Sequence, residues 1–134
     1  MQDPALKRRS LLRRFCDSDD LFARIEFLPG SDVSALAMPR GLLMLLAFWS
    51  GPSILGFKNI CQVFRQNHLP DDFIFRVLDI DGVCAGLLEK LAQHPIVIGG
   101  NAEGYWFRNG TIFSATTAHS ATNDRIQELL TEST

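Results

Sequence analysis

Two patterns of apolar residues alternate along the chain. In one, apolar residues recur every three or four positions, and in the other, apolar and polar residues alternate. The helical period predicts amphipathic helices, and the alternating period predicts half-buried strands. The helical pattern covers residues 5–16, 53–67 and 81–94. A last helix is predicted from Ser120 onward, with Ser or Thr at its start. Helices are therefore expected to separate most of the strands.

Extended segments are predicted between these helices. Residues 21–28 alternate well enough for a strand, and residues 42–48 form an apolar run that suits a strand buried on both faces. Residues 73–80 form a third strand. Two β-rich runs then flank Asn109-Gly110, a dipeptide that supplies the positive φ values of a tight hairpin turn. Strands joined through helices pair in parallel, so an α/β fold with an antiparallel hairpin is predicted.

Two loops interrupt the periodic pattern. Residues 29–41 are expected to form a loop with a short helix inside, and residues 99–104, GGNAEG, form a glycine-rich loop. The second loop precedes a strand, whereas phosphate-binding loops precede a helix. Tyr105, Trp106 and Phe107 follow it, and consecutive strand residues point to opposite faces of a sheet. We therefore expect these aromatic side chains to pack in the core.

Composition restricts the partners and the location. The 134 residues are 46% hydrophobic and 21% charged, which suits one soluble domain. A net charge of -2 gives no electrostatic reason to expect nucleic acid or an anionic membrane as partner. No apolar segment follows the basic N-terminal residues, and the run Leu42 to Trp49 is too short to cross a bilayer. The three cysteines, Cys16, Cys61 and Cys84, form no CxxC pair, which favours a cytoplasmic location.

The strongest chemical signal is the turn WSGPS, residues 49–53, which follows the buried strand and precedes a helix. Together with the strand ending in VLDID and the FRNG hairpin, this turn resembles thioredoxin, whose members carry Trp-Cys-Gly-Pro-Cys here. The resemblance covers residues 42–134, and residues 1–41 match only loosely. It implies a single thioredoxin-like domain over residues 1–134. The implied fold has a mixed central sheet flanked by helices, an extra N-terminal helix, and a C-terminal β-hairpin plus helix.

The reactive groups that the resemblance implies are all replaced in this chain. Ser50 and Ser53 stand at the positions of the nucleophilic and the resolving cysteine, and a hydroxyl cannot form a disulfide. Met44 stands at the position of the buried acid, and Ala102 at that of the cis-proline, so a trans bond is expected there. We therefore predict a natural, redox-inactive domain that is not an enzyme and holds no cofactor or metal.

Other chemical interpretations of these residues are weaker. Ser50 and Ser53 suit helix capping better than nucleophilic catalysis, because no histidine is placed at the turn. Cys61 and Cys84 are expected to be small buried side chains on or near the inward faces of their helices. The DIDG segment, residues 79–82, begins like a calcium loop but lacks its later ligands, so a strand end followed by a helix cap is favoured.

The first functional hypothesis is a non-catalytic protein-binding module, adaptor or chaperone-like. Such a module would engage another protein or an extended peptide through the face that carries the active site in thioredoxins. The predicted partner-binding residues are Trp49, Ser50, Gly51, Pro52, Ser53, Asn101, Ala102 and Glu103. The oligomeric state stays open.

Two alternatives belong to other functional classes. One is an immunity protein that neutralises a bacterial toxin through an acidic surface formed by residues 17–20, Glu26 and Asp32. The other is a residual glutathione- or thiol-related enzyme, which would depend on Ser50.

Overall fold

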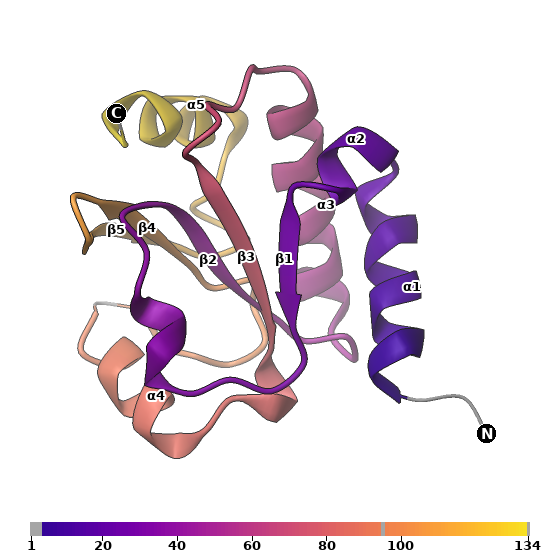
Figure 1. Cartoon of the computed structure of the whole chain (residues 1–134), viewed down its shortest axis with the longest axis vertical. Helices are drawn as coiled ribbons and strands as arrows, with labels where there is room; N and C mark the ends of the chain where they lie inside the picture. Colours follow the sequence, from indigo (N-terminus) through magenta and orange to yellow (C-terminus); the bar gives the residue numbers. More distant parts are fainter. Residues whose placement is uncertain (1–3, 95, 134) are drawn as a thin grey trace.

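A five-stranded mixed sheet lies at the centre of the molecule, in the order β1-β3-β2-β4-β5 (Figure 1). β1 (Ile25–Leu28), β3 (Ile74–Asp79) and β2 (Arg40–Leu46) are parallel neighbours. β4 (Gly104–Arg108) and β5 (Thr111–Thr116) continue the sheet in antiparallel pairing. The structure is a computed structural model, and it describes residues 4–94 and 96–133. The expected α/β fold with an antiparallel hairpin is confirmed.

One face of the sheet is covered by four helices, α1 (Pro4–Cys16), α2 (Asp19–Phe22), α3 (Gly51–Arg65) and α5 (Asn123–Glu132). Their apolar side chains form one continuous core with Trp106 of β4 and with β1, β2 and β3. α1 and α3 lie side by side in Figure 1 and pack directly on each other. The helical periods predicted for residues 5–16 and 53–67 therefore correspond to the two helices that dominate this face.

The opposite face is covered by α4 (Ala85–Leu91) and the 3-10 segment η1 (Val33–Leu36), which lies in the predicted loop 29–41. Tyr105 and Phe107 point into this second core, whereas Trp106 between them points into the first. The alternation predicted for these three aromatic residues is thus confirmed. Among the described helices, none is long and apolar enough to cross a bilayer.

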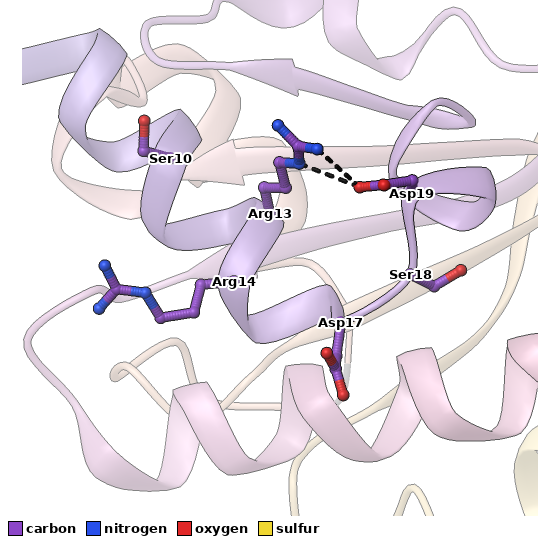
Figure 2. Close-up of a pocket in the computed structure, with 6 residues that line it drawn as sticks. All are labelled: Ser10, Arg13, Arg14, Asp17, Ser18 and Asp19. Carbon is purple, nitrogen blue, oxygen red and sulfur yellow. Dashed lines mark hydrogen bonds and ion pairs between the residues drawn. The ribbon is translucent and has the colours of Figure 1, made fainter.

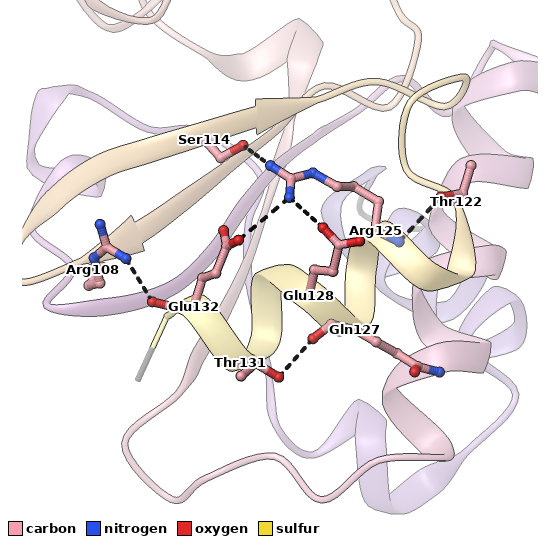
Figure 3. A network of polar contacts seen from close by, with 8 residues as sticks. All are labelled: Arg108, Ser114, Thr122, Arg125, Gln127, Glu128, Thr131 and Glu132. Atoms are coloured by element: carbon pink, nitrogen blue, oxygen red, sulfur yellow. Dashed lines mark hydrogen bonds and ion pairs between the residues drawn. The ribbon is translucent and has the colours of Figure 1, made fainter.

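The C-terminal helix is tied to the hairpin by arginine side chains (Figure 3). Arg125 of α5 donates to Ser114 of β5 at 3.3 Å and to Glu128 at 3.0 Å. Arg108, the last residue of β4, donates to the backbone oxygen of Glu132 at 3.0 Å. The bonds to Ser114 and from Arg108 hold α5 against the hairpin, and the Arg125–Glu128 pair lies within α5.

The strand predicted for residues 21–28 is shorter than expected. Only Ile25–Leu28 is extended, and Asp19–Phe22 forms the helix α2. Ser18 begins this helix, because its hydroxyl accepts from the backbone N–H of Leu21 at 3.2 Å. Local capping therefore overrides the alternating pattern at the start of this segment.

The helix predicted for residues 81–94 is also shorter than expected. Residues Ile80–Gly82 form a separate 3-10 turn, η2, and α4 begins only at Ala85. Cys84 is therefore at the N-cap position and exposed, so the prediction that it is buried is wrong. Cys61, in contrast, is fully buried, as predicted.

Candidate functional site

Three connecting segments meet at one edge of the sheet. Residues 47–50 follow β2, η2 follows β3, and residues 99–103 precede the antiparallel strand β4. Because β4 runs opposite to β2, the start of β4 lies at the same edge as the end of β2. The WSGPS turn and the glycine-rich loop are therefore neighbours, as the resemblance implied.

The two serine hydroxyls of the turn are both used by the backbone. Ser50 is the N-cap of α3, where its oxygen accepts from the N–H of Ser53 at 3.4 Å, and it donates to the carbonyl of Gly100 at 2.6 Å. Ser53 is fully buried, and its oxygen accepts from the N–H of Ala47 at 2.9 Å. One hydroxyl thus joins the turn to the glycine-rich loop, and the other joins α3 to the end of β2.

Trp49 is exposed and yet held in place. The residue is 64% exposed, and its indole N–H donates to a carboxylate oxygen of Asp81 in η2 at 3.3 Å. The far edge of the ring lies on Gly100, where an added Cβ would come within 2.7 Å of the indole. Gly100 also has a φ of +74°, which residues with a Cβ rarely adopt. Both the close indole and this backbone conformation therefore exclude a larger residue at position 100. The indole is fixed in orientation while most of its surface faces solvent.

Glu103 organises the glycine-rich loop from within. Its carboxylate is completely buried and accepts from the backbone N–H groups of Gly99 and Asn101. The negative charge of Glu103 also adds to the effect of burial, which raises the pKa of Tyr105 above its ordinary value. The carboxylate therefore serves as an anchor for the loop, and its oxygens face backbone donors of the chain.

Ala102 adopts the left-handed conformation, with a φ of 56°. No cis peptide bond occurs in the described residues, so the predicted trans bond before Ala102 is confirmed. A left-handed conformation costs a non-glycine residue about 1–2 kcal/mol, and such strain persists only where surrounding contacts enforce it. Asn101 accepts from the N–H of Ala118 at 2.8 Å, and an added Cβ on Gly56 of α3 would lie 2.5 Å from the Cβ of Ala102. This close approach explains a glycine inside α3.

The N-terminal helix also reaches this edge of the sheet. Arg8 of α1 forms an ion pair with the buried carboxylate of Asp79 and a second one, at 3.5 Å, with Asp81. Its guanidinium lies 5.3 Å from the ring centre of Phe48. Asp79 also accepts from the N–H of Asp81 at 3.0 Å, which matches the predicted strand end with a cap. These contacts of Arg8 could not be predicted from the sequence, because its partners are distant in the chain.

The hydroxyls of Ser50 and Ser53 are both engaged by the backbone. Their hydrogen-bond partners are the backbone groups of Ala47, Ser53 and Gly100, and none of these is a base. The side chain of Met44, where the resemblance implied an acid, is fully buried. Within residues 4–94 and 96–133, no group of three or more metal-ligating side chains is found.

Five of the eight predicted partner-binding residues lie at the surface, and three are buried beneath it. Trp49, Gly51 and Pro52 are exposed, and Ser50 and Asn101 are half-buried. These five residues are called the Trp49 face below. Ser53, Ala102 and Glu103 are buried, so they support this face and do not form part of its surface.

The acidic residues proposed for toxin binding mostly face arginines of the chain itself. Their shortest ion-pair distances are 3.8 Å for Asp17–Arg65, 2.9 Å for Asp19–Arg13 and 3.0 Å for Glu26–Arg76. Asp32 accepts from the hydroxyl and the backbone N–H of Ser34, and these bonds lower the pKa of Asp32. This arrangement gives no support to a free acidic surface.

Replacement of the turn serines is expected to cost stability. Ser53→Ala leaves the buried N–H of Ala47 without an acceptor, which should lower the free energy of unfolding by about 1–3 kcal/mol. Ser50→Ala removes an N-cap and the bond to Gly100, with an expected loss of about 1 kcal/mol. Urea titrations of both variants measure these losses. Unchanged midpoints would show that the hydroxyls have no structural role.

Solved thioredoxins share the architecture of this chain. Reduced thioredoxin pre-protein from Schistosoma mansoni has a TM-score of 0.57 at 15% identity, covering 82% of this chain and 98% of that one. Thioredoxin O1 from Arabidopsis thaliana has a TM-score of 0.56 at 16% identity, covering 81% and 96%. A mutant thioredoxin from Halobacterium salinarum has a TM-score of 0.56 at 18% identity, covering 82% and 90%. No protein-family profile and no curated protein sequence matches the chain. The fold is therefore thioredoxin-like.

Proposed function

We propose that this thioredoxin-like chain is a non-catalytic protein-binding module that holds another protein, or an extended peptide, on the Trp49 face. The observation that carries the proposal is a tryptophan that is 64% exposed and yet fixed by Asp81 and Gly100. Tryptophan is enriched among the few residues that supply most of the binding energy in protein interfaces. A side chain that is already ordered loses little conformational entropy on binding.

The surroundings of Trp49 suit an apolar segment of a partner. A shallow hollow beside the indole is lined by Phe48 and by Pro4, Lys7, Arg8 and Leu11 of α1. Arg8 is already paired with the carboxylates after β3, so its stem and Phe48 offer contact area more than free charge. A partner side chain placed here would contact two aromatic rings, the apolar side chains of Pro4 and Leu11, and the stems of Lys7 and Arg8.

The loop beside Trp49 favours recognition through side chains over strand addition. The carbonyls of Gly100 and Asn101 accept hydrogen bonds from Ser50 and Ala118, and the N–H groups of Gly99 and Asn101 donate to Glu103. An added strand needs free backbone donors and acceptors at the edge that it joins. These groups have partners within the chain, so a partner would gain its affinity from contact with Trp49 and its neighbours.

The absence of thiols at the turn suits a module that binds another protein reversibly, without a covalent bond. With serine at positions 50 and 53, no mixed disulfide forms between the turn and a bound protein. Release then depends only on the dissociation rate of non-covalent contacts. This property suits an adaptor or a chaperone-like holder.

Capture from a lysate of the source organism tests the proposal. The chain is immobilised without reductant in three forms, wild type, Trp49→Ala and Leu55→Ala, the last as a matched change at another exposed apolar residue. We expect bound protein to be retained by wild type and Leu55→Ala and to be lost with Trp49→Ala, by about 30-fold in affinity. One dominant protein indicates an adaptor, and many weak ones indicate a holder. Equal retention by Trp49→Ala would overturn the proposal.

A further inference from the structure

Two cysteines from different helices meet in the core on the α1 side of the sheet. Cys16 is the last residue of α1, and Cys61 lies in the middle of α3. Both are fully buried and belong to the same apolar core. The third cysteine, Cys84, is exposed at the start of α4, on the opposite face of the sheet.

Contacts on both sides of Cys61 align it with Cys16. One turn earlier on α3, the ammonium of Lys58 lies 5.4 Å from the ring centre of Phe15. One turn later, Arg65 donates to the backbone oxygen of Cys16 at 3.5 Å. Phe15 and the backbone of Cys16 thus contact α3 one turn before and one turn after Cys61, so the two thiols are neighbours in the core, and each shifts the pKa of the other.

We propose that Cys16 and Cys61 form a redox site separate from the WSGPS turn, a thiol pair that a hydroperoxide converts into an intrachain disulfide joining α1 to α3. The thiols come from two packed helices, so the bond requires no rearrangement of the sheet. It would fix α1, and with it Arg8 beside Phe48, to the helix that begins at the turn. The inference does not depend on the proposed binding function.

The two thiols have different roles in the expected reaction. The neighbouring Cys61 thiol lowers the pKa of Cys16, and the contact with the backbone of Ser18 and the charge of Arg65 add to this lowering, whereas burial and the charge of Asp17 oppose it. Burial raises the pKa of Cys61. Cys16 is therefore the thiolate that attacks the hydroperoxide, and Cys61 is the resolving thiol.

The reaction balances in two steps. The Cys16 thiolate takes the terminal OH of the hydroperoxide, whose O–O bond breaks, and becomes a sulfenic acid; the alkoxide, or hydroxide from hydrogen peroxide, takes up the proton that the Cys16 thiol lost on ionising and leaves as an alcohol or water. The Cys61 sulfur then attacks the Cys16 sulfur, the S–O bond breaks, and the oxygen departs as water with the Cys61 proton. The two thiols are oxidised by two electrons, and the peroxide is reduced by two.

Access to the pair requires local opening at the end of α1. Figure 2 shows this region, where Asp17 and Ser18 connect α1 to α2 and Arg13 is hydrogen-bonded to Asp19. Helix ends and short connections open more readily than core elements. Oxidation of the pair is therefore expected to be slower than oxidation of the exposed Cys84 thiol.

Labelling of free thiols tests this proposal in the full chain. Cys84→Ser removes the third thiol at an exposed position and leaves the pair intact. The reduced variant is treated with hydrogen peroxide, unfolded, and labelled with a maleimide. We expect oxidised protein to take up no label, to weigh about 2 Da less than the reduced form, and to regain both labelling sites after dithiothreitol.

Two controls decide the outcome. In peroxide-treated wild type, a digest without reductant should contain a peptide pair that links Cys16 to Cys61. The double variant Cys16→Ser/Cys84→Ser should keep its single label after mild oxidation. Retention of both labels in peroxide-treated Cys84→Ser, or a mass gain that dithiothreitol does not reverse, would overturn the proposal.

Discussion

Replacement of Trp106 by alanine is expected to lower the free energy of unfolding by about 3–5 kcal/mol. This indole is completely buried on the face covered by α3, where it meets the ring of Phe64 edge-on with centroids 6.1 Å apart. Its N–H donates to Thr116 of β5 at 3.2 Å, so the substitution also leaves a buried hydroxyl without its partner. Chemical denaturation monitored by circular dichroism measures the loss.

The second tryptophan of the chain provides the matched control. Trp49→Ala removes the same side chain from an exposed position and should cost less than about 1 kcal/mol. We expect Trp49→Ala to affect binding, and Trp106→Ala to affect stability. Equal stability losses in the two variants would contradict the assignment of Trp106 to the core and of Trp49 to the surface.

Glu103→Ala is expected to have the second largest effect, a loss of about 2–4 kcal/mol. The substitution removes the acceptor for the N–H groups of Gly99 and Asn101 and leaves a cavity under the loop. Asn101, which precedes Ala102 in its left-handed conformation, then loses its bond to the carboxylate. Thermal and urea unfolding measure the effect, with Glu103→Gln as the matched variant.

Glu103→Gln keeps one oxygen that can accept a hydrogen bond and should lose about 1 kcal/mol. It also removes the negative charge that adds to the raised pKa of Tyr105, so this pKa should fall while burial keeps it above its ordinary value. Spectrophotometric titration of the tyrosine reports this change. Identical stability of wild type and Glu103→Ala would show that the buried carboxylate does not organise the loop.

Elements with a strong local period could be predicted from the sequence. The helix over residues 53–67 and the hairpin at Asn109-Gly110 depend on contacts between near neighbours in the chain, and the structure has φ values of 53° and 78° at the hairpin turn. The helix α2 was not predicted, because a segment as short as Asp19–Phe22 fits an alternating and a helical pattern equally well. Only the capping residue Ser18 distinguishes the two. Its signal was present in the sequence, as a serine followed by two aspartates.

The candidate site could be predicted only in part. WSGPS and its neighbour loop were identified from the motif, but the contacts that hold Trp49 come from Asp81 and Gly100, which lie far along the chain. The buried role of Glu103 was missed, because a glutamate in a glycine-rich loop resembles a surface residue. Its position directly before a strand of aromatic residues was the one local sign of burial.

The most direct test of the central claim follows the two indole N–H signals by nuclear magnetic resonance. The isotope-labelled chain contains two tryptophans, so Trp49→Ala assigns both signals. The captured protein, or a peptide from it, is then added stepwise. The proposal predicts that the Trp49 signal shifts or broadens with saturation while the Trp106 signal stays in place. Saturable binding without any change at Trp49 would contradict it.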